Sequence, residues 1–203
     1  RIRENCSRKA YMPISGGGDC TGSGAQEFNR GRIALNGEDL ERYRVLAREN
    51  LRDRRYEHVL NVTRLAGELA ERYGEDVSAA QAAGLLHDVT KQKPLAEQLQ
   101  TIQNSGILYD KTFLSTTNVY HAVTGYLYAR DVLGIEDPQV LNAIRYHTTG
   151  RAGMSRMEKI VYLADAVSYE RDYPDAARLR KLAFSDLDVC MLEVLAFTVE
   201  KLV

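Results

Sequence analysis

Apolar residues recur at helical spacing along most of the chain from Glu38 onward. Two successive apolar faces are formed by Leu40, Tyr43, Ala47 and Leu51 and by Tyr56, Val59, Thr63, Ala66, Ala70 and Tyr73. Their intervals of three and four residues match the period of an α-helix, about 3.6 residues per turn. No alternating run longer than about four residues indicates a strand. The pattern therefore predicts an all-α fold.

Polar residues and glycines predict where the helices begin and end. Gly74 closes the second apolar face and suits the left-handed residue that follows a helix. Ser78 and Ser155 each precede Gln or Glu by three residues, which is the spacing of a capping box. Further N-caps are predicted at Asn118, Asp137, Asp175 and Asp186, and further helix ends at Gly106 and Gly134.

The composition indicates a single globular domain without a nucleic-acid or membrane surface. Of the 203 residues, 44% are hydrophobic and 27% charged, and the net charge is −1. A balanced charge offers no attraction to a polyanion, and no apolar run approaches the length of a membrane span. Three scattered cysteines, Cys6, Cys20 and Cys190, form no paired motif. They favour a reducing compartment, so we expect a cytoplasmic protein.

Residues 1–36 differ from the rest of the chain. They contain glycine- and serine-rich stretches at 15–19 and 21–24 and lack apolar periodicity. We expect a flexible, disordered leader over 1–36 and one compact domain over 37–203. Residues 1–6 (RIRENC) and 11–13 (YMP) also resemble the carboxyl tail of bacterial nicotinate-nucleotide adenylyltransferases.

The candidate chemistry lies in the histidines, all of which occur in or beside helical segments with apolar neighbours. Together with two aspartates they form the ordered series His58, His87, Asp88, His121, His147 and Asp165. Imidazole and carboxylate suit divalent Fe, Mn, Zn or Mg, and the lack of cysteine argues against structural zinc. Any one of these residues alone is more often an ordinary core or surface residue. The ordered set predicts one metal site assembled from five segments. Asp88 is the natural shared ligand if that site is dinuclear.

Four segments carry a resemblance to a known family. They are RYEH (55–58), LLHDVTK (85–91), IRYHTTG (144–150) and LAD (163–165) followed by RDYP (171–174). In order and spacing the chain resembles the HD-domain superfamily of metal-dependent phosphohydrolases, and within it the YqeK family of bacterial hydrolases. The resemblance spans residues 38–203 and implies a single HD-domain helical bundle.

The resemblance also implies an activity and its cofactor. Members of that family cleave diadenosine tetraphosphate symmetrically to two ADP by metal-activated water, and use one or two iron ions. Manganese or another divalent metal is an alternative. The implied primary ligands are His58, His87, Asp88 and Asp165, with Asp88 also catalytic. His121 and His147 either hold a second ion or donate hydrogen bonds to phosphate, and both roles place them in the substrate-binding site.

A polyphosphate substrate also requires cations. Lys91, three residues beyond Asp88, is expected to bind phosphate or the leaving oxygen, with Arg55 and Arg171 as further phosphate-binding residues. Arg145 and Arg151 are weaker candidates, and Tyr109 and Tyr173 are candidates for contact with a base. The chain departs from the family pattern at two positions. Ser168 stands where the family often has an acid, and Ala166 where an aromatic residue is common.

Two other functions remain open at this point. One is a different HD phosphohydrolase, such as a 5′-nucleotidase. A cyclic-dinucleotide phosphodiesterase is disfavoured because residues 87–91 (HDVTK) depart from the usual His-Asp-x-Gly-Lys loop. The other is a catalytically silent nucleotide-binding regulatory module. The expected partner is a small nucleotide. A homodimer, and a fusion or neighbour relation to a nicotinate-nucleotide adenylyltransferase, are further hypotheses.

Overall fold

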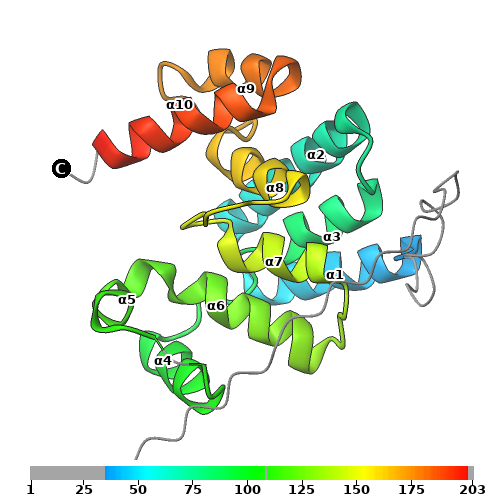
Figure 1. Ribbon diagram of the computed structural model, residues 1–203. Coiled ribbons are helices and arrows are strands. Elements are labelled where there is room, and N and C mark those ends of the chain that lie inside the picture. The colour runs from blue at the N-terminus through cyan, green and yellow to red at the C-terminus, as the bar shows by residue number, and fades with distance from the viewer. Residues whose placement is uncertain (1–34, 108, 201–203) are drawn as a thin grey trace, which may run out of the picture. The chain divides into compact units, whose positions relative to one another are not determined.

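The computed structural model describes residues 35–107 and 109–200, which form helices and no strand (Figure 1). The predicted all-α class is confirmed. The α-helices are α1 (Gly37–Asn50), α2 (Asp53–Tyr73), α3 (Val77–Leu86), α4 (Leu95–Asn104), α5 (Lys111–Ser115), α6 (Tyr120–Leu127), α7 (Pro138–Tyr146), α8 (Arg156–Ala166), α9 (Ala176–Ser185) and α10 (Leu187–Glu200). A 3₁₀ turn, η1 (Thr117–Val119), precedes α6, and a π-helical turn, η2 (Tyr128–Val132), follows it.

The core is built around α2 and α3, with α7 and α8 packed against α3. These helices bury large apolar side chains completely, among them Leu65, Leu69, Leu86, Ile144 and Ile160. Gly84 of α3 faces Thr63 of α2, and a Cβ at Gly84 would lie only 2.8 Å from Thr63 Cα. The close approach of α2 and α3 therefore requires glycine at this position.

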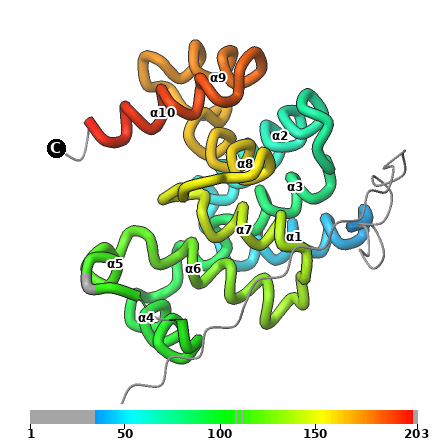
Figure 2. The backbone as a smooth tube through the Cα atoms, viewed as in Figure 1, coloured from blue at the N-terminus to red at the C-terminus, as the bar shows by residue number. Residues whose placement is uncertain are grey.

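The remaining helices flank this core. A second cluster of Ile102, Tyr120, Val123 and Leu127 joins α4 to α6. Figure 2 shows α9 and α10 lying together beside α8, where Leu179, Leu187 and Met191 are buried. Within the described part of the chain, no helix is both long and apolar enough to cross a bilayer.

Several predicted boundaries are confirmed. Gly74 ends α2 with φ of 68°. Asp137 caps α7 by accepting from Gln139 N, with Pro138 in the first turn. Ser155 and Glu158 form the predicted capping box of α8, and Asp186 Oδ1 accepts from Val189 N at the start of α10. The caps at Asp137, Ser155 and Asp186, whose side chains accept from the backbone, were therefore predicted correctly.

Other predicted boundaries are wrong. The box at Ser78 does not form, because Asp76 lies two residues earlier and caps α3 by accepting from Ala79 N. Asn118 lies inside the 3₁₀ turn, and α6 begins at Tyr120. Asp175 is the N-cap residue of α9 as predicted, although its carboxylate accepts from the Arg178 side chain and not from the backbone.

The predicted leader over 1–36 lies outside the described residues except for Leu35 and Asn36. Asn36 caps α1 by accepting from the backbone N–H of Glu38 and Asp39, in a capping box that sequence analysis missed. The boundary between leader and domain stays a prediction. So does the resemblance of the first residues to an adenylyltransferase tail.

The Gly84 contact gives a test of the core. Gly84→Ala should lower the free energy of unfolding by about 1–3 kcal/mol, because the added methyl group must push α2 away from α3. Gly37→Ala is the control, since nothing lies within 4 Å of a Cβ there. Urea unfolding followed by circular dichroism measures both. Equal midpoints for Gly84→Ala and the unaltered protein would show that α2 and α3 are not in close contact.

Candidate metal centre

The centre forms where α3 ends. His87 is the C-cap of α3, and Asp88 opens a turn in which Val89 N donates to Leu86 O and Lys91 N to Asp88 O. Neighbouring residues in a continuous helix point about 100° apart, as its period of about 3.6 residues per turn requires. The turn instead brings both side chains into one cluster. Thr90 Oγ1 ties this turn to α6 by donating to His121 O at 3.0 Å.

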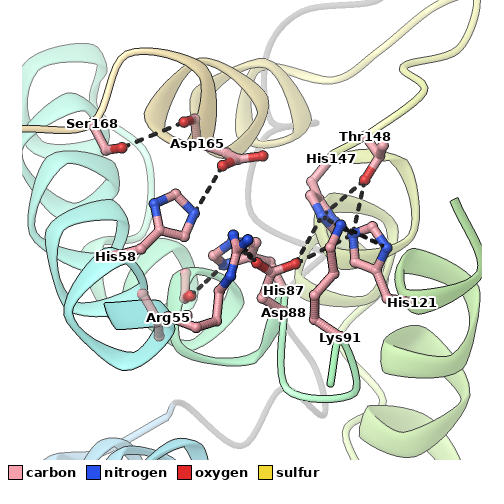
Figure 3. Close-up of polar contacts among 12 residues, drawn as sticks. Arg55, His58, His87, Asp88, Lys91, His121, His147, Thr148, Asp165 and Ser168 are labelled. Atoms are coloured by element: carbon pink, nitrogen blue, oxygen red, sulfur yellow. Dashed lines mark hydrogen bonds and ion pairs between the residues drawn. The ribbon is translucent and has the colours of Figure 1, made fainter. Parts of the chain in front are cut away.

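The structure brings together all six residues that the sequence singled out (Figure 3). His58 comes from α2, His121 from α6, His147 from the C-cap of α7 and Asp165 from α8. Five of the six are buried, whereas Asp165 keeps 24% of its side chain exposed. The predicted assembly from five segments is therefore present in the geometry.

Three imidazole rings are anchored through Nδ1. His87 Nδ1 donates to Gly84 O at 2.7 Å, and His147 Nδ1 donates to Ile144 O at 2.8 Å. His58 Nδ1 instead donates to a carboxylate, Glu170 Oε1, at 2.5 Å. A hydrogen bond donated from Nδ1 favours the neutral tautomer whose lone pair lies on Nε2. Nε2 is thus the ring atom available to a metal.

Asp88 lies at the middle of the cluster. Its Oδ1 is 3.2 Å from His121 Nε2 and 3.7 Å from His147 Nε2. Its Oδ2 is 3.6 Å from His87 Nε2 and accepts from Arg55 Nη1 at 2.9 Å. One carboxylate therefore faces two groups of ligands. His58 and His87 lie on one side, and His121 and His147 lie on the other.

The donor set fits a divalent metal. The Nε2 atom of His87 is buried and makes no hydrogen bond to any described residue, whereas His58 Nε2 lies 3.0 Å from Asp165 Oδ1. Unpartnered buried nitrogens are costly unless a ligand satisfies them. His121 Nε2 and His147 Nε2 are 3.1 Å apart, and two atoms that bind one ion at about 2.1 Å commonly lie about 3 Å apart. Ligand atoms within 4.8 Å of one another form three overlapping groups, and Asp88 belongs to two of them.

The surroundings of the histidines shift their pKa values in opposite directions. Burial alone lowers the pKa of His58, but contacts with Asp165 and Glu170 outweigh burial and raise this pKa to about 9. Burial lowers the pKa of His87 to about 4, and burial with the neighbouring His147 lowers the pKa of His121 to about 3. Burial raises the pKa of the Asp88 carboxyl, but the surrounding histidines hold it well below its usual range.

The three predicted phosphate-binding cations lie at the edge of the cluster. Lys91 Nζ is 3.1 Å from both ring nitrogens of His121, and burial lowers the Lys91 pKa. Arg55 donates to Asp88, and Arg171 Nη2 donates to Asp165 Oδ1 at 3.0 Å. The Arg55 and Arg171 side chains keep 35% and 39% of their surface exposed. Each therefore contacts a proposed ligand while remaining accessible to an anion.

The weaker candidates have structural partners. Arg151 forms two hydrogen bonds to the buried Glu158, and Arg145 lies over the rings of Tyr126 and Tyr146. Tyr173 stacks on Phe197 and donates to Ala166 O. Tyr109 stacks on Phe113. All four side chains therefore have partners among the described residues.

Sequence analysis missed two polar residues of the centre. Thr148 Oγ1 lies 3.0 Å from His147 Nε2 and 3.2 Å from His121 Nε2. Its place in the His-Thr-Thr-Gly segment was the available clue. Glu170 contacts His58 and also accepts from Ser168 Oγ at 2.6 Å. The acid that appeared to be missing at Ser168 is therefore present two residues later.

Comparison with known proteins identifies the family of this chain. The HD-domain family model matches residues 55–170, and the chain belongs to this family. A symmetrical bis(5′-nucleosyl)-tetraphosphatase from Halalkalibacterium halodurans is 36% identical over 76% of this chain and 82% of its own length.

Two further relatives extend the comparison. A crystal structure from Clostridium acetobutylicum, described as a predicted HD superfamily hydrolase involved in NAD metabolism, superposes with a TM-score of 0.76 at 36% identity. It covers 79% of this chain and 85% of its own. A probable nicotinate-nucleotide adenylyltransferase/Ap4A hydrolase from Mycoplasma genitalium is 33% identical over 71% of this chain, which spans 42% of that protein.

The histidine environments predict a distinct pH titration for each ring. In protein stripped of metal, His58 should titrate near pH 9, whereas His87 and His121 should stay neutral at pH 6. Because the His58 pKa is raised from 6.5, its pairing stabilises the fold fully below pH 6.5, and this contribution is lost as the pH rises through 9. NMR of the imidazole protons measures the midpoints, with His58→Ala to assign the signal. A His58 midpoint at or below 6.5 would contradict the pairing with Asp165 and Glu170.

Proposed function

We propose that this protein hydrolyses diadenosine tetraphosphate symmetrically to two ADP, using a metal centre built on Asp88. The observation that carries the proposal is the cluster of four histidines and two aspartates at one carboxylate. The similarity to symmetrical bis(5′-nucleosyl)-tetraphosphatases over most of both chains supports the choice of substrate.

We assign His58, His87, Asp88 and Asp165 as primary ligands, with His121 and His147 completing a second group around Asp88. The two oxygens of Asp88 face different histidines, so Asp88 could serve either group of ligands if a metal were bound. Iron is the proposed metal, with manganese as an alternative, because the nitrogen and oxygen donor set suits both. A bound divalent ion lowers the pKa of a water and neutralises phosphate charge.

The cations of the chain bind and orient the polyphosphate. The exposed guanidinium surfaces of Arg55 and Arg171 suit paired hydrogen bonds to phosphate oxygens. Lys91 is held beside His121 at the edge of the buried cluster. Its ammonium group can therefore neutralise the oxygens of the departing half. Thr148 offers a hydroxyl next to two histidines as a further donor.

Cleavage at the centre of the four-phosphate bridge releases a stabilised leaving group. Attack at the second phosphorus from either end expels ADP, whose negative charge is spread over two phosphates. Interactions that strengthen as this charge develops raise kcat rather than ground-state affinity. Cations that contact the departing ADP therefore contribute more to the rate than cations that contact the rest of the substrate.

Another HD phosphohydrolase, such as a 5′-nucleotidase, is the alternative that uses the same ligand set. A catalytically silent regulatory module is disfavoured by the complete cluster of potential ligands. A cytoplasmic location is supported by the lack of paired cysteine motifs. A relation to an adenylyltransferase is supported by the name of the Mycoplasma genitalium relative. The homodimer rests on the family resemblance alone.

The ligand assignment predicts a specific loss in one variant. Asp88→Asn should lose its metal and its turnover while keeping the helical circular-dichroism spectrum, because the amide lacks the charge that both groups of histidines face. Elemental analysis and a hydrolysis assay with added Fe(II) measure the two effects. Asp188→Asn is the control, since Asp188 is exposed and pairs with Lys159 away from the centre. Full metal content in Asp88→Asn would refute the assignment.

The nucleotide products show which bond of the four-phosphate bridge is cleaved. Diadenosine tetraphosphate should yield ADP as the sole nucleotide at early times. Lys91→Ala should lower kcat at least tenfold with a smaller effect on KM, since its interaction strengthens as leaving-group charge develops. Lys93→Ala is the matched control, because Lys93 pairs with Glu97. Equal amounts of AMP and ATP would indicate an asymmetric register. No turnover with Fe(II) under reducing conditions would favour the nucleotidase alternative.

A further inference from the structure

The three anchored histidines do not obtain their anchors in the same way. His87 and His147 are C-caps, and each donates to the carbonyl three residues earlier. Carbonyls in the last turn of a helix lack intrahelical partners and are free to accept such a bond. The helix end itself therefore orients these two rings.

His58 has no such carbonyl within reach in its own helix. It is the sixth residue of α2, where the preceding carbonyls accept from the next turn of the helix. Its Nδ1 atom is buried and must find an acceptor on another element. Glu170, from the segment after α8, is that acceptor at 2.5 Å.

The segment that carries Glu170 is held at several points. Ser168 is fully buried, and its hydroxyl donates to the same oxygen, Oε1, that accepts from His58. From α9, Arg180 donates to Val167 O and to Ser168 O, each at 2.6 Å. The Arg180 guanidinium also lies over the Tyr169 ring. These contacts hold the backbone just before Glu170 and one oxygen of its carboxylate.

We propose that Glu170 is a positioning residue of the metal centre, buttressed by Ser168 and Arg180. It holds the His58 ring with Nδ1 protonated and Nε2 directed into the cluster. The proposal rests on the proposed role of His58 as a ligand. It also accounts for serine at position 168, where the family pattern often has an acid. The hydroxyl there supports a carboxylate supplied from two residues later. A carboxylate behind a ligating histidine increases the basicity of that ligand, as second-layer acids do in other metal sites.

The test is metal affinity in the full-length chain, measured by EPR of free Mn(II) during titration. Glu170→Gln should weaken Mn(II) binding about 10- to 100-fold, the usual effect of losing such a partner. Ser168→Ala should weaken it less. The double variant should bind no more weakly than Glu170→Gln alone, because Ser168 acts through Glu170. Glu57→Gln is the control. It makes the same charge change on an exposed residue next to His58.

A second measurement separates positioning from a general structural effect. In Zn(II)-loaded protein, the His58 Nδ1 proton should resonate far downfield and move upfield in Glu170→Gln, because an amide oxygen is a weaker acceptor. Wild-type affinity and an unchanged proton shift in Glu170→Gln would overturn the proposal. Complete metal loss, equal to that of His58→Ala, would also overturn it by making Glu170 a ligand itself. If His58→Ala keeps its metal, the assignment of His58 as a ligand fails as well.

Discussion

The structure of the site depends on the burial of one carboxylate. Asp88 is only 2% exposed, and an isolated ionised carboxylate at such depth would be strongly destabilising. Arg55 and three histidines surround it, each from a different helix or helix end. Two helices that pack on α3, namely α2 and α7, therefore also place a group beside Asp88, and α6 supplies another. A substitution that shifts one of these helices would therefore also change the electrostatic environment of Asp88.

Helix termini do much of the orienting. The ends of α3 and α7 provide free carbonyls that align His87 and His147, while α2 provides only the backbone position of His58. This difference explains why the centre needs a long-range partner at one histidine and not at the others. It also explains why the segment after α8 is so extensively hydrogen-bonded, although it contains no regular structure.

The sequence predicted the helical class and the set of six clustered residues, because apolar periodicity and rare residue types are local and countable. It failed where competition between neighbours decides the outcome. Asp76 displaced Ser78 as a cap, and Asn118 entered a 3₁₀ turn. Glu170 was overlooked because its role depends on a contact with His58, 112 residues away. Arg145 and Arg151 likewise contact tertiary partners that no spacing rule reveals.

The uneven exposure of the centre governs what can approach it. Asp165 is the only member of the six with appreciable exposure, and the half-exposed guanidinium groups of Arg55 and Arg171 lie beside the acids. The accessible edge of the centre therefore carries two guanidinium groups, each already paired with an acid of the cluster. An anion that binds there competes with Asp88 and Asp165 for the same arginines. Arrival of a polyanion would thus loosen the hold of these arginines on the two carboxylates.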